Sequence, residues 1–356
     1  MTLEERINDG LQGKYQGLSN GLDRINDYIF GIQRGCYYLL GGQSGTFKTS
    51  LADFMIFNAI QDADSKGISI NIYYYSFEID ALTKKCIWLS THIYKKHGMI
   101  IPPEKIKGLG RNRLTQSELA IVQAEMPYIE SIFSRIKFTF ESINPTGIYN
   151  TLWKEAESRG TIEYETIQDK DKIVKKIKKY HPNNPEEYNI IVLDHLYLLR
   201  KERGYDAKEV IDKYSEYCVT LRNIFGYSIL NIQQFNDGLS TVDRQKFRGV
   251  DLSPQQNDFK DTRNPFQDAD VVLGTMNPYK LDMQECIGYD VNRLGRFMIM
   301  LKVIKNRLSE DNIMIGLFIN PKAGLFKELP SPNNITKMNS VYSTIEKLYN
   351  EMKKNE

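Results

Sequence analysis

The strongest chemical signal in the sequence is a glycine-rich segment, Gly41-Gly42-Gln43-Ser44-Gly45-Thr46-Phe47-Lys48-Thr49-Ser50. It follows a short apolar run and precedes a helical stretch at 51–60. Backbone N–H groups at a strand-to-helix turn, together with the helix dipole, favour a bound triphosphate. In such a loop the lysine reaches the β- and γ-phosphates, and the hydroxyl that follows it ligates Mg²⁺. We therefore expect ATP to be bound by Gly42, Gln43, Ser44, Gly45, Thr46, Phe47, Lys48, Thr49 and Ser50, with Thr49 as a magnesium ligand.

One position departs from the usual spacing of this loop. Phe47 stands where a glycine normally precedes the lysine. A phenylalanine there carries a steric penalty if its backbone needs a positive φ, although Gly45 can absorb part of the turn. The spacing predicts nucleotide binding and leaves the rate of hydrolysis open. A glycine-rich turn with a chance Lys-Thr pair is the alternative.

Two carboxylates follow apolar runs downstream of this loop. The run at 190–193 ends in Asp194, an arrangement in which the acid orients Mg²⁺. The run at 70–75 leads to Glu78, and ligands of open α/β sheets bind at the carboxyl ends of the strands. Glu78 is thus placed to orient or deprotonate the water that attacks the γ-phosphate, whereas a helix N-terminal acid is the alternative. We expect the neighbouring His195 to be packed or hydrogen-bonded rather than catalytic.

Further polar groups could sense the nucleotide and contact a polynucleotide. Gln234 follows the apolar run at 228–232, where an amide can sense the γ-phosphate; a surface amide is the alternative. The loop at 237–260 carries basic side chains among Gly, Ser and Gln, and such a loop can follow a phosphate backbone without reading bases. Acidic residues dilute its charge, so one copy would bind weakly and six copies around a ring would not; a solvated loop is the alternative. The candidate DNA contacts are Arg244, Lys246, Arg248 and Lys260.

The elements that must position these groups are those of an α/β protein. From residue 21 onwards, short apolar runs alternate with longer helical stretches, which predicts βαβ units and a mostly parallel central sheet. The apolar runs are hydrophobic on both faces, as strands covered by helices on both sides must be. We expect strands at 36–40, 70–75, 136–140, 190–193, 228–232 and 271–274.

A C-terminal antiparallel hairpin is expected after this sheet. Apolar runs at 297–304 and 313–319 flank a polar turn. Lys305 and Arg307 lie near that turn. An arginine on a projecting hairpin suits a finger that acts in trans on the ATP of a neighbouring subunit, although exposed hairpin arginines are common.

Three segments lie outside the core pattern, which we assign to an ATPase domain at 21–330. Residues 1–20 are polar, and we expect a short helix at 3–11 followed by a linker. Residues 161–187 hold six lysines and six acids and predict a solvated helix in a charged insertion, with a nucleic-acid or partner contact as the alternative. Residues 331–356 form a polar tail in which apolar residues at helical spacing predict a short amphipathic helix.

Length and composition exclude several classes of protein. The chain has 356 residues, with 41% hydrophobic side chains and a formal net charge of +2, so no global field attracts nucleic acid. This globular composition excludes a wholly disordered chain and a disulfide-stapled miniprotein. The four cysteines are far apart, which disfavours zinc and disulfides. No run is long enough to span a membrane and the N-terminus does not look like a signal peptide, so we expect a cytoplasmic protein.

Taken together, these segments resemble the helicase domain of the DnaB-type replicative DNA helicases, a RecA-like hexameric family. The resemblance runs from about residue 17 to about residue 330. Its most specific part is Asp258-Phe259-Lys260-Asp261-Thr262, continuing to Gln267-Asp268-Ala269-Asp270-Val271-Val272, where the family pattern is D-L-R-E-S and then Q-D-A-D-V-V. The motifs S-L-E, Q-L-N and K-x-R are matched by Ser76-Phe77-Glu78, Gln234-Phe235-Asn236 and Lys305-Asn306-Arg307.

The resemblance implies a fold, residue roles and partners. It implies a RecA-like P-loop NTPase core with Glu78 as the catalytic glutamate and Asp194 as the Walker B acid. It makes Arg307 the arginine finger of a neighbouring subunit and Lys305 its companion. The implied activity is ATP-driven translocation of a hexameric ring on single-stranded DNA, with primase and polymerase as replisome partners. The family's N-terminal collar domain has no counterpart in the short segment before the core, which suggests a phage or plasmid source.

Two other functions stay open from the sequence. One is a RecA-like strand-exchange or filament ATPase that binds DNA without unwinding it, which Phe47 and the missing collar favour slightly. The other is a nucleotide-dependent scaffold that does not hydrolyse ATP. Unwinding of a forked duplex and the choice between closed rings and open filaments distinguish these functions.

Overall fold

The computed structural model describes residues 2–11, 13, 15–109, 111, 113–169, 172–236, 252–259 and 263–354, without the side chains of 167–169, 172–174, 263 and 351–354. The strands are β1 (Tyr37–Gly42), β2 (Ile70–Ser76), β3 (Ile136–Thr139), β4 (Gly160–Asp169), β5 (Lys172–Pro182), β6 (Tyr188–Asp194), β7 (Ser228–Gln234), β8 (Val271–Met276), β9 (Glu285–Cys286), β10 (Tyr289–Asp290), β11 (Met298–Asn306), β12 (Ile313–Asn320) and β13 (Leu325–Glu328). The α-helices are α1 (Leu3–Leu11), α2 (Asp23–Ile29), α3 (Lys48–Lys66), α4 (Ala81–His97), α5 (Pro103–Ile106), α6 (Gln116–Phe133), α7 (Pro145–Arg159), α8 (Ala207–Phe225), α10 (Arg263–Asp268), α11 (Val291–Leu294) and α12 (Ile335–Lys354).

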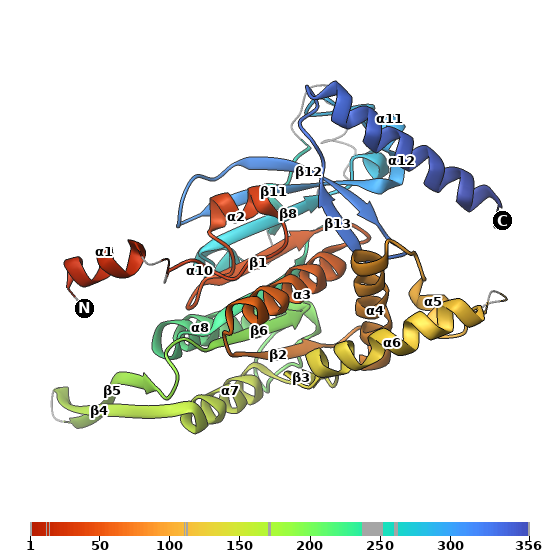
Figure 1. Cartoon of the computed structure of the whole chain (residues 1–356). Coiled ribbons are helices and arrows are strands. Elements are labelled where there is room, and N and C mark those ends of the chain that lie inside the picture. Colours follow the sequence, from red (N-terminus) through yellow and green to blue (C-terminus); the bar gives the residue numbers. More distant parts are fainter. Residues whose placement is uncertain are drawn as a thin grey trace.

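The central sheet joins a parallel block to an antiparallel block (Figure 1). Within the described residues it has nine strands in the order β13-β12-β11-β8-β1-β7-β6-β2-β3. Strands β8 to β3 of this order run parallel, whereas β11, β12 and β13 run antiparallel to their neighbours. The α/β class, the mostly parallel sheet and the C-terminal antiparallel hairpin are therefore as the sequence predicted; the short strand β13 was not foreseen.

Helices cover both faces of the parallel block, and β1 shows what this requires of the sequence. Tyr38 and Leu40 pack in the core that contains residues of α3, α4 and α6. Tyr37 and Leu39 pack in the core that contains residues of α7 and α8. Because successive side chains of a strand point to opposite faces, a strand buried on both faces must be apolar throughout. This is why continuous apolar runs located the strands.

Local sequence sets the ends of the helices next to the site. Asp80 caps the N-terminus of α4 by accepting a hydrogen bond from the backbone N–H of Thr83 at 3.0 Å. Gly67 ends α3 in the left-handed region with φ of +65°. Its backbone N–H donates to carbonyls of the last turn, which satisfies groups that the helix leaves unpaired.

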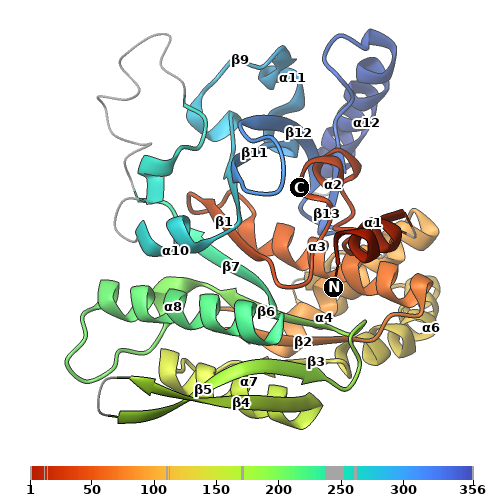
Figure 2. The same ribbon diagram turned by 90° about the vertical axis from the view of Figure 1, so that its left-hand side faces the viewer.

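The charged insertion does not form the solvated helix that its charge run predicted. It forms β4 and β5, a two-stranded antiparallel ribbon outside the central sheet (Figures 1 and 2). In β4, Ile162 and Tyr164 alternate with Glu163 and Glu165. This two-residue period and the β-branched and aromatic side chains favour a strand, and they outweigh the high charge of the segment.

The two terminal helices differ in how they pack. Helix α1 covers the predicted residues, and none of its side chains is buried. Helix α12 is longer than a short tail helix, and its Met338 and Ile345 are buried in a third core that includes residues of β11. In the described part of the chain, no helix is both long enough and apolar enough to cross a membrane.

Candidate active site

The candidate site lies at the carboxyl ends of β1, β2, β6 and β7. A cavity of about 210 Å³ opens there. Parallel neighbours end at the same edge of a sheet, so the topology gathers groups that are far apart in the sequence. The cavity is lined by Ser44, Gly45, Phe47, Lys48, Thr49, Glu78, Asp194, His195 and Gln234.

The glycine-rich loop adopts a left-handed turn in spite of Phe47. Phe47 has φ of +61° and ψ of 29°, and Gly45 also has a positive φ of +70°. The left-handed region costs a non-glycine residue about 1–2 kcal/mol. The Phe47 ring packs against the buried core around α3, which offsets part of this cost. The position thus keeps the glycine conformation, and Gly45 does not remove the strain from Phe47.

Close packing explains the glycine at the start of the loop. A Cβ at Gly42 would lie 2.1 Å from Oγ1 of Thr275 and 2.5 Å from Oγ1 of Thr46. These two hydroxyls form a hydrogen bond of 2.8 Å, and that of Thr275 also donates to the carbonyl of Gly41 at 3.2 Å. Thr275, at the end of β8, therefore holds the loop; the sequence analysis did not identify it.

Lys48 lies in the cavity and folds back onto its own loop. Its Nζ donates to the carbonyl oxygen of Gln43 at 2.7 Å. Burial lowers the pKa of Lys48 to about 8, although the negative charges of Asp194 and Glu78 favour its charged form. A phosphate oxygen is a stronger partner for an ammonium than a carbonyl, so the loop is suited to exchange one for the other.

Thr49 and Asp194 form the part of the site that fits a hard cation. Oγ1 of Thr49 donates to Oδ1 of Asp194 at 3.1 Å. Asp194 is fully buried, and its Oδ2 has no hydrogen-bond partner among the described residues. Burial raises the pKa of Asp194 to about 6, against the opposing effect of the Lys84 charge. A buried carboxylate oxygen without a partner, next to a hydroxyl, suits Mg²⁺, which takes oxygen ligands.

Glu78 faces the cavity and is held by His195. Nε2 of His195 lies 3.1 Å from Oε1 of Glu78. The Glu78 side chain is 48% exposed, whereas that of His195 is 12% exposed. Burial lowers the pKa of His195, although Glu78 opposes the shift, so the imidazole is neutral at pH 7. The expectation of a hydrogen-bonded histidine is confirmed, and its partner is the candidate catalytic acid.

A buried ion pair that the sequence analysis missed lies behind the site. Nζ of Lys84 on α4 donates to both carboxylate oxygens of Asp53 on α3, at 3.0 and 3.1 Å. The hydroxyl of Tyr74 on β2 donates to Asp53 at 2.7 Å. All three side chains are buried. The pair ties the helix that follows the phosphate loop to the helix that follows Glu78; the one signal in the sequence was an acid on the inward face of α3.

Arg307 and Lys305 lie at the opposite edge of the sheet. Asn306 pairs with Val271 at the start of β8, whereas the phosphate loop adjoins Thr275 near its end. Four residues of strand separate the two edges by about 13 Å. Arg307 is 50% exposed and contacts Asp270 of its own chain at 3.2 Å. The structure therefore does not bring Arg307 into its own cavity.

Lys305 has a partner set of its own. Its Nζ donates to the carbonyl oxygens of Phe266, Gln267 and Ala269 at 2.9, 2.7 and 2.8 Å. Burial lowers its pKa to about 8, and the charge of Arg307 adds to this shift. In this conformation Lys305 satisfies carbonyls at the end of α10 and is not directed at a ligand.

The predicted DNA contacts Arg244, Lys246, Arg248 and Lys260 lie outside the described residues. Within the described residues, no group of three or more His, Cys, Asp or Glu side chains is arranged to hold a metal ion. The four cysteines are buried free thiols.

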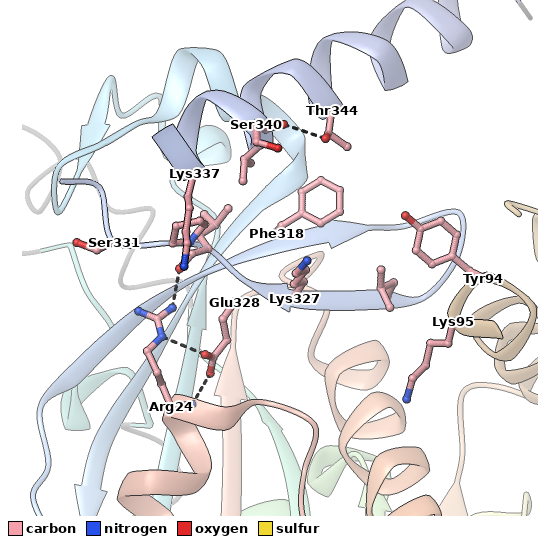
Figure 3. Close-up of a pocket in the computed structure, with 14 residues that line it drawn as sticks. Arg24, Tyr94, Lys95, Phe318, Lys327, Glu328, Ser331, Lys337, Ser340 and Thr344 are labelled. Atoms are coloured by element: carbon pink, nitrogen blue, oxygen red, sulfur yellow. Dashed lines mark hydrogen bonds and ion pairs between the residues drawn. The ribbon is translucent and has the colours of Figure 1, made fainter. Parts of the chain in front are cut away.

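A larger cavity, of about 1000 Å³, lies between α12 and the β12–β13 hairpin (Figure 3). Its lining includes Lys327, Lys337 and Arg24, which pairs with Glu328 at 3.0 Å. It contains neither the glycine-rich loop nor Asp194. The groups suited to phosphate chemistry are therefore in the smaller cavity.

Comparison with known proteins identifies the fold. No protein-family model and no curated protein matches the sequence. The solved ATPase domain of a helicase matches in structure with a TM-score of 0.67 and 15% identity, over 92% of this chain and 99% of that chain. A DnaB-like replicative helicase, described with its interactions with primase, matches with a TM-score of 0.64 and 14% identity, over 91% of this chain and 67% of that chain. The chain thus has the RecA-like fold of these helicase ATPase domains, as the motifs implied.

Replacement of Asp194 by Asn is expected to stabilise the nucleotide-free protein at pH 7.5. The folded-state pKa of about 6 exceeds the ordinary value of 3.8, so the folded chain binds more protons between about pH 4 and 6. Stability from this group is present at low pH and is lost as the pH rises through 6. We expect Asp194→Asn to raise the free energy of unfolding by roughly 2–3 kcal/mol at pH 7.5 and by little at pH 4.

Urea unfolding at both pH values measures this effect, and phosphate release measures the loss of Mg²⁺-dependent hydrolysis. Glu141→Gln, an exposed change at the same sheet edge, is the control. A lower stability of Asp194→Asn at pH 7.5 would contradict the assignment of Asp194 as a strained, buried acid.

Lys84→Met is expected to cost about 3–5 kcal/mol of folding free energy, because it leaves Asp53 buried without its counter-ion. The double variant Asp53→Leu/Lys84→Met should recover much of that loss. The control is Lys85→Met, which removes a surface ion pair with Glu130 and should change stability by less than about 1 kcal/mol. Denaturant titration decides; equal effects of Lys84→Met and Lys85→Met would refute a structural role for the buried pair.

Proposed function

We propose that this chain is an ATP-driven replicative DNA helicase of the DnaB type, which hydrolyses ATP at subunit interfaces of a ring, translocates on single-stranded DNA and unwinds duplex. The observation that carries the proposal is the separation of two half-sites. Lys48, Glu78 and Asp194 share one edge of the sheet, and Arg307 is exposed at the other. A head-to-tail contact between copies would complete the site, and such contacts close into rings when the rotation allows.

The residues around the cavity suggest a division of labour for hydrolysis. Lys48 and the loop N–H groups would bind the phosphates, and Thr49 and Asp194 would hold Mg²⁺, which supplies charge neutralisation when bound. Glu78, oriented by His195, would accept the proton of the attacking water. Gln234 pairs with Gly42 at the end of β7 and would sense the γ-phosphate.

Arg307 would act on the nucleotide of a neighbour. Its own phosphate loop is about 13 Å away along the strand direction, which exceeds what rotation of the side chain can close. Its present contact with Asp270 is half-exposed, so exchange for a phosphate has little desolvation cost. Lys305, bonded to three carbonyls, would support the position of Arg307 as its companion.

Helix α1 supports assembly with a neighbouring copy. Leu3, Ile7 and Leu11 are spaced on one helical face and are 77%, 55% and 83% exposed. An isolated helix of this length gains little stability from itself, so an apolar face of this kind suggests packing on another surface. We propose that residues 1–20 contact the adjacent subunit, with 21–330 as the motor and 331–356 as its helical tail.

The proposed partners are single-stranded DNA, further copies of the chain in a hexamer, and the primase and polymerase of a replisome. Arg244, Lys246, Arg248 and Lys260 are the proposed DNA contacts. The likeness to a helicase described with its interactions with primase supports this set of partners.

Mixing two inactive variants is expected to restore activity if Arg307 acts in trans. Lys48→Ala should abolish ATP hydrolysis, and Arg307→Ala should lower it about 10³-fold or more. In mixed rings, a Lys48→Ala chain still donates Arg307 to the intact loop of an Arg307→Ala chain. An equal mixture should regain about a quarter of wild-type hydrolysis, because about one interface in four is complete.

Phosphate release after dissociation and reassembly of the two chains provides the measurement. Arg203→Ala, an exposed arginine elsewhere, is the control and should retain wild-type activity. Activity of Arg307→Ala alone at the wild-type level, or no recovery in assembled mixtures, would contradict completion of the site by a neighbour.

Unwinding of a forked duplex distinguishes the motor from a filament ATPase. We expect ATP-dependent strand separation by wild type and none by Lys48→Ala. Microscopy with nucleotide and a single-stranded oligonucleotide should reveal closed rings. Open filaments that hydrolyse ATP without unwinding would replace the helicase proposal with the RecA-like alternative.

A further inference from the structure

The β4–β5 ribbon is anchored at its base and free along its length. Ile162 and Tyr180 are paired in register and pack on the core beneath α7 and α8. The Tyr180 hydroxyl donates to the carbonyl of Ala156 at 2.8 Å, and its ring meets Phe225 at 5.1 Å. Beyond this pair the ribbon projects from the body (Figures 1 and 2). Since the central sheet does not include it, the outer ribbon is not needed to complete the core.

Charge is divided between the two strands. All the charged residues of β4 are acidic, whereas β5 carries five lysines and no acid. Of the described side chains, Lys175, Lys176, Lys178 and Lys179 are exposed. Ion pairs among the described side chains of the ribbon join Glu163 to Lys178 at 2.6 Å and to His181 at 3.2 Å. Lys176 and Lys179 take no part in these pairs, so β5 presents uncompensated positive charge.

The ribbon leaves the body at the same sheet edge as Arg307. Its second strand leads into Tyr188, the first residue of β6, and Arg307 adjoins the first residue of β8. Both strands begin at this edge because they are parallel. Strand order places three spacings between them, or about 14 Å. A neighbour that receives Arg307 therefore approaches the face from which the ribbon emerges.

The opposite edge, which would face this one in a head-to-tail contact, is acidic next to the site. Glu78 lies there, and the side chains of Asp80 before α4 and Glu141 after β3 are exposed. Lysines of one copy would thus meet carboxylates of the next. Such complementarity favours the correct partner and speeds association.

We propose that the β4–β5 ribbon is a contact arm that binds a second copy of this chain through the lysines of β5. The arm rests on the proposed function, because the head-to-tail arrangement sets its direction. It extends the interface beyond the catalytic residues, and it presents open strand edges whose backbone groups can pair with the neighbour.

The test compares two ribbon variants with wild type. Lys176→Glu/Lys179→Glu reverses charge on the arm. The second variant replaces residues 163–179 by Asn-Gly, which joins Ile162 to the opposing Tyr180 by a two-residue hairpin turn. Both leave the catalytic residues intact. Mass photometry with Mg²⁺ and a slowly hydrolysed ATP analogue gives the protein concentration at half-assembly, and circular dichroism checks the fold.

We expect both variants to raise the half-assembly concentration about fivefold or more at low salt, and the charge-reversal effect to shrink near 0.5 M salt. Lys337→Glu/Lys347→Glu, the same charge change at exposed positions of α12, should leave it unchanged. ATP hydrolysis by the ribbon variants should recover at high protein concentration.

Three results would overturn the arm. One is an unchanged half-assembly concentration in both ribbon variants. A second is unchanged assembly with weaker binding of a labelled oligonucleotide or duplex, which would make the ribbon a nucleic-acid contact. The third is full hydrolysis by a wild-type chain that stays monomeric, which would reject the proposed function itself, whereas the first two reject the arm alone.

Discussion

Burial of Asp194 beside Thr49 is the constraint on which the rest of the structure depends. An acid at the end of a central parallel strand has helices on both sides and no access to water, and burial alone would neutralise it. The fold opposes this with the positive charge of Lys84, which is itself kept charged by Asp53. Part of the cost persists as a raised pKa and an oxygen without a partner, so a cation is favoured at the one place where it is needed.

The sheet also separates the two halves of the catalytic set. A strand carries its two ends apart by its own length, and β8 has the phosphate loop beside its end and Arg307 beside its start. No rearrangement of side chains within one copy can unite these ends. Parallel packing therefore makes assembly a condition of complete chemistry, and the positions of α1 and of the β4–β5 ribbon acquire a meaning that a single copy does not give them.

Departures from the motif pattern were informative in different ways. Phe47 replaces a glycine and still adopts the left-handed turn, because its ring gains contacts with the core around α3. The charged insertion formed a ribbon, since the alternation of Ile162 and Tyr164 with acids has the period of a strand. Composition suggested a solvated helix there, and periodicity was the better guide.

The sequence by itself determined the strands, the glycine-rich loop and the acids that follow them, because apolar runs and motif spacing are local properties of the chain. It also indicated Glu78, Asp194 and Gln234, since parallel strands must end at a common edge. Tertiary structure alone decided that His195 contacts Glu78, that Lys84 and Asp53 pair behind the site, and that Arg307 lies across the sheet. Those facts depend on which strands become neighbours and on which helix faces meet, and long-range packing, rather than the order of residues, sets both.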